Sequence, residues 1–286
     1  MRIPWLAHGF STRTGGVSRV YGGNALNLGF TQHDSRAAVV QNRRAFVFAV
    51  LKSASAKGST DRRVSRLPTP WPVITLRQIH SDLIHCVSKL PDAPLAGDGL
   101  LSRTPGILLG VLAADCIPVI LADRKRRAVG VFHAGWRGTA KRIVEKGVGE
   151  MRRYFGCRPD DIKAAVGPGI RGCCYQVGPE VRQSFEAQFS YARELFRETK
   201  ESDEVREKYP LLFLTARAPG HSELPKRIFL DLAEANRRQL ISAGVLAKNI
   251  SDLGLCTSCH VERFFSHRAE KGNTGRMLAV AGIRQA

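Results

Sequence analysis

Three apolar runs follow one another closely in the middle of this chain, and they limit its fold more than any other feature. The runs cover residues 107–113 (ILLGVLA), 118–122 (PVILA) and 128–132 (AVGVF), and none of them contains a charged side chain. Runs this short and this apolar are typical of strands that are buried on both faces of a sheet. We therefore expect a layered protein built around a sheet.

Helical patterns alternate with the strand patterns. Residues 139–155 place apolar side chains at helical spacing, and Thr139 is a suitable N-cap. Residues 231–243 predict a second helix, which begins after Asp231 as N-cap and ends before Gly244. Because strands and helices alternate, the sequence predicts an α/β or α+β protein.

The 286 residues allow one or two domains, and we expect a single domain over residues 1–286. Residues 53–70 are small, polar and basic, which predicts a flexible surface insertion. Residues 194–208 are charged, and we expect them to be helical or irregular. Residues 73–79 predict a further strand.

The chain is strongly basic, since 44 Lys and Arg against 25 Asp and Glu give a net charge of +19. Such an excess favours an anionic substrate or a polyanionic partner. The basic residues are scattered and no RNA-binding aromatic signature is present, so nucleic acid is the less favoured partner. No apolar stretch is long enough to span a membrane and the first residues lack a signal-peptide core, so we expect a cytoplasmic location.

A cysteine and a histidine are expected to meet at the open end of a predicted hairpin. If Ala122 pairs with Ala128, Cys116 lies opposite Ala134, which is one position from His133. A thiol and an imidazole this close can bind zinc or can act as a nucleophile and its base. A buried thiol beside a hydrogen-bonded histidine is the third interpretation.

The neighbours of this pair favour a functional site. Gly135, Trp136 and Arg137 lie in the turn before a helix, where free N–H groups and a positive dipole end attract anions. Asp115 precedes Cys116 directly. A third metal ligand would complete a catalytic zinc site, and the candidates by position are His80, His8, His85 and His267.

The remaining cysteines give a weaker pattern. The seven cysteines are an odd number, which favours reduced thiols over a disulfide framework. Cys256, Cys259 and His260 resemble half of a zinc ribbon, but no second pair has ribbon spacing, because Cys173 and Cys174 are adjacent. We expect buried or redox-sensitive thiols here, with a structural metal as the alternative.

Several motifs taken together resemble one family over nearly the whole chain, from His8 to Arg276. The chain is similar to the YfiH-like "laccase domain" family through HGFSTRTGGVS (8–18), NLG (27–29), NRR (42–44), RQIHS (77–81), GDGLLS (97–102), ADCIPV (114–119), HAGWRGT (133–139), GPGI…CCYQVG (167–178), DLAEAN (231–236) and CTSCH…RFFSHR…TGR (256–276). The resemblance implies a single-domain α+β protein with mixed sheets in α/β/β/α layers, a cysteine-hydrolase-like fold. It also implies one metal, zinc with copper as the alternative, held by His80, Cys116 and His133.

The family's older name, multicopper polyphenol oxidoreductase, can be tested against the composition. Copper in multicopper oxidases is bound mainly by imidazole, largely in His-x-His pairs. This chain has eight histidines and no His-x-His pair. The sequence therefore argues against phenol oxidation as its main activity.

The resemblance implies purine nucleoside phosphorylase and adenosine deaminase activities, with adenosine, inosine and methylthioadenosine as substrates. A zinc ion with one open position makes bound water reactive near neutral pH, which deamination requires, and Asp115 is the candidate proton carrier. Phosphorolysis requires positive charge around the phosphate. The candidates are Arg13, Arg137 and Arg268 for phosphate, Asn27 and Gln78 for the nucleoside, Gly135 for close approach in the turn, and Trp136 for stacking on the base.

Two other functions stay open at this stage. One is a Cys116–His133 hydrolase that edits a cytoplasmic peptidoglycan precursor by cleaving an amide bond. The other is a polyanion-binding module, suggested by the net charge alone. We expect a monomer or a small homo-oligomer.

Overall fold

The computed structural model describes residues 3–53, 71–200 and 226–285. The predicted insertion at residues 53–70 falls outside this range except for Ser53, which ends a helix. The described helices include none that is both long enough and apolar enough to cross a membrane.

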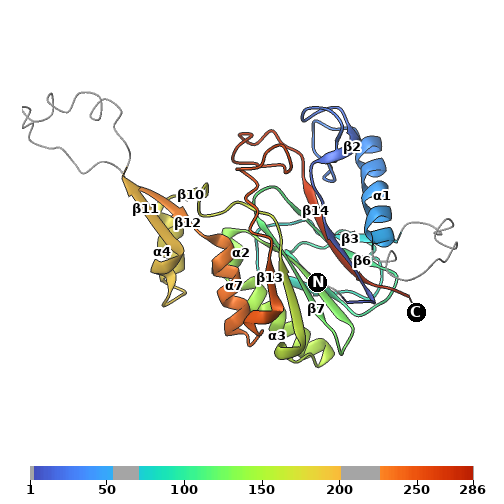
Figure 1. The fold of residues 1–286 in the computed structure, drawn as a ribbon. Helices are drawn as coiled ribbons and strands as arrows, with labels where there is room; N and C mark the ends of the chain where they lie inside the picture. Colours follow the sequence, from blue (N-terminus) through green and yellow to red (C-terminus); the bar gives the residue numbers. More distant parts are fainter. Residues whose placement is uncertain (1–2, 54–70, 201–225, 286) are drawn as a thin grey trace, which may run out of the picture.

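Two mixed sheets lie face to face and form the centre of the molecule (Figure 1). The larger sheet has the strand order β13-β9-β7-β8-β5-β4, and the smaller has the order β1-β14-β6-β3. The larger comprises β4 (Ile84–Cys86), β5 (Gly99–Ser102), β7 (Ile117–Asp123), β8 (Ala128–Ala134), β9 (Ile162–Val166) and β13 (Ile250–Asp252). The smaller comprises β1 (Leu6–Phe10), β3 (Val73–Thr75), β6 (Leu108–Ala113) and β14 (Met277–Ile283).

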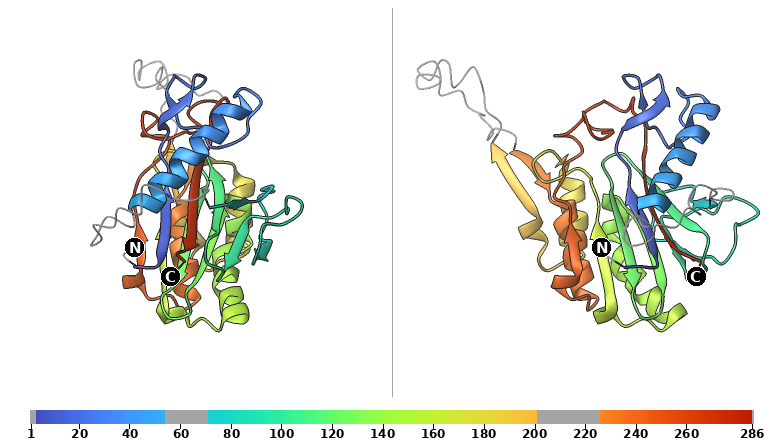
Figure 2. Two further views of the ribbon diagram at one scale, coloured as in Figure 1. Left: turned by 90° about the vertical axis from the view of Figure 1, so that its right-hand side faces the viewer. Right: turned by 45° about the vertical axis from the view of Figure 1, so that its right-hand side comes forward.

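Helices cover the outer face of each sheet. Helix α1 (Arg36–Ser53) packs on the smaller sheet, and α3 (Ile143–Phe155) and α7 (Leu232–Ser242) pack on the larger (Figures 1 and 2). Every residue of β7, β8 and β14 is buried, because each of these strands has a packed layer on both faces. The structure confirms the expected single-domain α+β protein with α/β/β/α layers.

A small third sheet lies at one end of the molecule (Figure 1). It contains β10 (Gln176–Val177), β11 (Phe196–Lys200) and β12 (Lys226–Leu230), and α4 (Pro179–Glu186) precedes β11. The expectation of a helical or irregular segment at 194–208 is therefore wrong over β11, which pairs antiparallel with β12. Strand β2 (Thr14–Ser18) lies near α1 at the other end.

The hairpin of β7 and β8 forms as expected, but its register differs by one residue. Asp123, not Ala122, pairs with Ala128, and Ile117 lies opposite Ala134. The Asp123 carboxylate accepts the backbone N–H groups of Lys125 and Arg126 at 2.8 and 2.9 Å, which closes a shorter turn than we predicted. Cys116 therefore lies just before β7, still at the open end of the hairpin.

The long helix predicted over 139–155 is two helices. Helix α2 (Trp136–Ala140) ends before Arg142, whose left-handed conformation (φ 66°) a continuous helix does not allow, and α3 follows. Thr139 lies inside α2 and bonds to Asn236, so it is not an N-cap. Asp231 is confirmed as N-cap of α7, since its carboxylate accepts the N–H of Glu234 at 2.9 Å.

The strand predicted over 73–79 is shorter than expected, because β3 ends at Thr75. The chain then leaves the sheet edge as a loop and reaches His80 in a left-handed conformation, with φ 57°. This turn brings the His80 side chain away from the strand direction and towards the open end of the β7–β8 hairpin.

Candidate active site

His80, Cys116 and His133 meet at this open end. One ligand atom from each of them lies within 4.8 Å of the other two. His133 is in β8, Cys116 directly precedes β7, and His80 follows β3, so three separate segments contribute to the group. The two imidazole rings lie edge to face with centroids 5.0 Å apart. Of the competing histidines, His267 lines the adjoining cavity without joining the group.

Asp98 is the residue of this site that sequence reasoning missed. Its carboxylate is fully buried and accepts a hydrogen bond from Nδ1 of His133 at 2.8 Å. It also accepts the backbone N–H groups of His80 at 3.1 Å and Ser81 at 2.6 Å, so one carboxylate fixes two of the segments. The only signal was the GDG pattern at 97–99, which an ordinary turn before β5 also explains.

The charges of these groups are tightly linked. Burial alone would raise the pKa of Cys116. The charge of His133 and hydrogen bonds from His133 and His80 have a larger, opposite effect and lower this pKa to about 6. Burial lowers the pKa of His133, but the Cys116 thiolate and the hydrogen bond to Asp98 raise it to about 9. Burial alone would raise the pKa of Asp98. Hydrogen bonds from His133 and Ser81 have a larger effect and lower the pKa of Asp98 to about 2. Cys116 and His133 therefore each stabilise the charged form of the other.

The donor set of this group fits a zinc ion. One thiolate and two imidazoles are the ligands of known catalytic zinc sites, which keep a fourth position open. The hydrogen bond from Nδ1 of His133 to Asp98 leaves Nε2 free for a metal, an arrangement common around protein-bound zinc. Cys116 and both histidines also line a cavity, so a fourth ligand can approach from that side.

This cavity has a volume of about 540 Å³, which suits a small organic molecule. Two other cavities have similar volumes of about 550 and about 690 Å³, but no described cysteine or histidine lines them. The polar and aromatic side chains around the first are Gln78, His80, Asp115, Cys116, His133, Trp136, Arg137, Tyr175, His267, Arg268 and Arg276. Tyr175, His267 and Arg276 were not among the predicted substrate contacts.

Two of the predicted polar residues in this cavity are held by other protein groups. Both carboxylate oxygens of Asp115 are used, one by the Thr257 hydroxyl at 2.6 Å and one by the backbone N–H of Arg268 at 2.7 Å. The amide of Gln78 bonds both backbone groups of Leu112, at 2.7 and 2.8 Å. Each of these residues therefore fixes a wall of the cavity.

The arginines of the cavity are differently placed. The guanidinium of Arg137 lies over the ring of Trp136 at 4.4 Å from its centroid. That of Arg268 lies over the ring of Tyr175 at 5.4 Å and donates to the Gln176 carbonyl at 2.8 Å. Neither arginine forms an ion pair with a carboxylate among the described residues. Both therefore bring positive charge and exposed N–H groups to the cavity.

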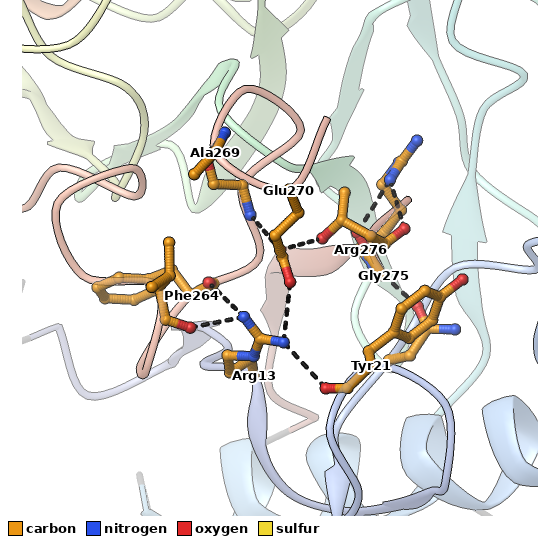
Figure 3. A network of polar contacts seen from close by, with 11 residues as sticks. Arg13, Tyr21, Phe264, Ala269, Glu270, Gly275 and Arg276 are labelled. Carbon is orange, nitrogen blue, oxygen red and sulfur yellow. Dashed lines mark hydrogen bonds and ion pairs between the residues drawn. The ribbon is translucent and has the colours of Figure 1, made fainter. Parts of the chain in front are cut away.

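Arg13 and Asn27, which we predicted to contact substrate, do not line this cavity. The Arg13 guanidinium bonds to Glu270 at 3.1 Å and to the Tyr21 carbonyl at 2.9 Å (Figure 3). Asn27 is fully buried and its amide oxygen accepts the N–H of Arg276 at 2.9 Å. The positions of Arg13 and Asn27 suit a structural role, in which their side chains hold the loops around the site together.

A methyl group at Gly135 would crowd the side chains of His80 and Cys116. A Cβ at this position would lie 3.0 Å from Cδ2 of His80 and 3.1 Å from Sγ of Cys116. We expect Gly135→Ala to weaken zinc binding about tenfold by displacing these ligands, as measured by competition with a chromogenic chelator. Gly149→Ala is the matched control, because its Cβ would meet nothing within 4 Å, and unchanged zinc affinity in both variants would contradict the proposed ligands.

Comparison with known proteins identifies a matching family model and several similar proteins. Residues 7–284 match the family model described as multi-copper polyphenol oxidoreductase laccase. A purine nucleoside phosphorylase of Deinococcus radiodurans is 36% identical, over 99% of this chain and 92% of that protein. An adenosine deaminase, RL5, of an unknown prokaryotic organism is 37% identical over 65% of this chain and 62% of that protein.

Solved structures agree with this match. The crystal structure of the hypothetical protein YfiH of Bacillus licheniformis superposes with a TM-score of 0.76 at 31% identity, covering 98% of this chain and 93% of the other. The family match, the identity to the Deinococcus radiodurans protein and the shared fold each extend over nearly the whole chain. The chain belongs to the multi-copper polyphenol oxidoreductase laccase family.

Proposed function

We propose that this protein is a zinc-dependent purine nucleoside phosphorylase that also deaminates adenosine. The observation that carries this proposal is the position of the His80–Cys116–His133 group on the wall of a nucleoside-sized cavity that Arg137 and Arg268 also line, where neither arginine pairs with a carboxylate of the described residues. Relatives named purine nucleoside phosphorylase and adenosine deaminase support the same activities. The substrates we expect are adenosine, inosine and methylthioadenosine, with phosphate as the second substrate.

His80, Cys116 and His133 would hold the zinc ion, and copper is the alternative metal for this donor set. A bound zinc supplies a Lewis acid and makes a water molecule acidic near neutral pH. Asp98 keeps the His133 ring in one orientation and one tautomer. The deamination step also needs a group that transfers protons. Asp115 carries the only carboxylate among the described residues that line the cavity, and it would exchange its bond to Thr257 for this role.

Phosphorolysis needs a different part of the same cavity. Arg137 and Arg268 can pair with the oxygens of a phosphate, since planar guanidinium groups bind such oxygens in pairs. The rings of Trp136 and Tyr175, which line the cavity beside them, offer faces for the purine base. A nucleoside between the aromatic rings and the metal-ligand group would place its ribose near the phosphate.

The direct test is product analysis with protein of measured zinc content. Adenosine, inosine and methylthioadenosine are incubated with and without phosphate, and the products are separated by chromatography. We expect free base and ribose 1-phosphate (5-methylthioribose 1-phosphate from methylthioadenosine) only when phosphate is present, and inosine with ammonia from adenosine in its absence. Failure of all three nucleosides to react with zinc-loaded protein would refute the proposal.

Arg137 allows a more specific prediction. We expect Arg137→Ala to raise the KM for phosphate at least about tenfold while changing phosphate-independent deamination little, because the lost charge serves phosphate alone. Arg137→Lys should restore part of the loss. Arg152→Ala, on the exposed face of α3, is the matched control for net charge. An unchanged KM for phosphate in Arg137→Ala would remove this residue from the phosphate site.

One geometric observation favours a second candidate function. Cys116, His133 and Asp98 are connected in series, as are the nucleophile, base and orienting acid of cysteine hydrolases. Such an enzyme could cleave an amide in an anionic peptidoglycan precursor. A metal-independent hydrolase would survive a strong chelator and lose activity with iodoacetamide, whereas the proposed phosphorylase loses activity with the chelator.

A further inference from the structure

Four cysteines from two distant parts of the sequence gather on one side of the candidate active site. Cys173 and Cys174 lie in the loop between β9 and β10, and Cys256 and Cys259 lie in the segment between β13 and β14. All four sulfur atoms lie within 4.8 Å of one another. The sulfur of Cys259 is 3.5 Å from that of Cys173 and 3.3 Å from that of Cys174. The adjacency of Cys173 and Cys174, which argued against a zinc ribbon in the sequence, does not separate the two pairs in space.

The spacing of these sulfur atoms suits a tetrahedral metal ion. Zinc–sulfur bonds of about 2.3 Å place the sulfurs of a tetrahedral site about 3.8 Å apart. The sulfur of Cys259 lies 3.5 and 3.3 Å from two of the other sulfurs, slightly closer than that value, and no two of the four sulfurs are more than 4.8 Å apart. A disulfide requires about 2.05 Å and uses only two sulfurs, so it leaves the convergence of all four unexplained.

The backbone around the cluster holds the two loops together. Gly169 and Cys256 form a parallel bridge, and the N–H of Thr257 donates to the Gly169 carbonyl at 3.1 Å. Arg171 forms an ion pair with Asp252 at 2.6 Å, which adds a second link between the same loops. The cluster is thus placed before any ion binds, which lowers the ordering cost of binding one.

We propose that Cys173, Cys174, Cys256 and Cys259 bind a second zinc ion, which has a structural role and is separate from the ion at His80, Cys116 and His133. On binding, the thiols release their protons to the solvent and four zinc–sulfur bonds form, so no oxidant or reductant takes part. Four protein ligands leave no open position, which is typical of structural sites.

The second ion would act on the cavity through the loops that it joins. Tyr175, which lines the cavity, directly follows Cys174. Thr257, which lies between the ligands Cys256 and Cys259, donates to Asp115. Loss of this ion should therefore lower thermal stability and loosen the cavity wall without removing the first metal.

The experiment counts zinc in protein purified under reducing conditions, by elemental analysis after removal of loosely bound metal. We expect two ions per chain in the wild type and one in Cys256→Ser, in Cys259→Ser and in Cys116→Ser. Cys86→Ser is the matched control, because this exposed cysteine on β4 belongs to neither group, and it should retain both ions.

A spectroscopic measurement covers the case in which the Cys256 variant does not fold. In cobalt-substituted Cys116→Ser, only the proposed second site remains, and its thiolate-to-cobalt absorption should be about four times that of a site with one thiolate. A metal-free Cys116→Ser protein would overturn the proposal. So would a wild-type chain with one zinc ion and a disulfide among these four cysteines under reducing conditions. Either result leaves the proposed nucleoside activity untouched, because that activity depends on the other metal.

Discussion

Cys116→Ala is expected to lower kcat/KM for nucleosides by at least about a thousandfold and to abolish binding of the proposed zinc ion at the candidate active site. Cys116 supplies the single thiolate of that group, and the remaining two imidazoles lie on different segments, with no third ligand beside them in the part of the chain that the structure describes. A two-ligand site of this kind binds zinc too weakly to retain it in dilute solution. The measurements are steady-state kinetics with inosine and phosphate and zinc content after dialysis.

The control for this variant must separate loss of the site from loss of the fold. Cys86→Ser removes an exposed thiol from β4 and should keep both metal and turnover. The thermal unfolding midpoint and circular dichroism of Cys116→Ala should stay close to those of the wild type, because Cys116 lies at the end of a strand and on a cavity wall. Wild-type turnover in a Cys116→Ala protein without metal would show that the metal plays no part.

Asp98→Asn is expected to weaken zinc binding and turnover about 10- to 100-fold, although Asp98 touches neither metal nor substrate. Its carboxylate accepts the Nδ1–H of His133, and an amide that presents its NH₂ group there would favour the wrong tautomer of the ring. The charge and hydrogen bond of Asp98 raise the pKa of His133. In the metal-free variant the pKa of His133 should therefore fall below about 9, as measured by NMR of the ring protons.

Asp82→Asn is the matched control for this second variant. Asp82 lies nearby in the sequence, but its carboxylate pairs with Lys141 and Lys146 at the surface. We expect its replacement to leave zinc affinity and the pKa of His133 unchanged. If Asp98→Asn lowered stability but left zinc affinity and the His133 pKa at wild-type values, Asp98 would be a structural residue alone.

The sequence predicted the layers of this protein because its strands are short and apolar enough to require cover on both faces. It also predicted that Cys116 and His133 lie close together, and this survived a register error of one residue. The reason is physical: both residues lie at the open end of the hairpin, where a shift of one position changes their separation little. The error itself came from Asp123, whose side chain closes the turn with two backbone hydrogen bonds.

Other parts of the site could not be derived from local patterns. His80 reaches the group through a left-handed turn after a three-residue strand, and no spacing rule predicts that path. Asp98 is a long-range partner, 35 positions from His133 in the sequence, and its pattern is that of an ordinary turn. The four-cysteine cluster depends on how two loops meet in space. Such contacts between distant segments are set by tertiary packing and leave no periodic signal.

We expect the ion proposed at His80, Cys116 and His133 to be required for phosphorolysis of purine nucleosides. The most direct measurement is a zinc titration of metal-free protein, with phosphate-dependent release of hypoxanthine from inosine recorded at each addition. To exclude the proposed second site, the titration is repeated with Cys259→Ser. We expect no release without metal and a rate that rises in proportion to zinc until one ion per chain is bound in that variant. A full rate in metal-free protein, or no release at any zinc content, would contradict it.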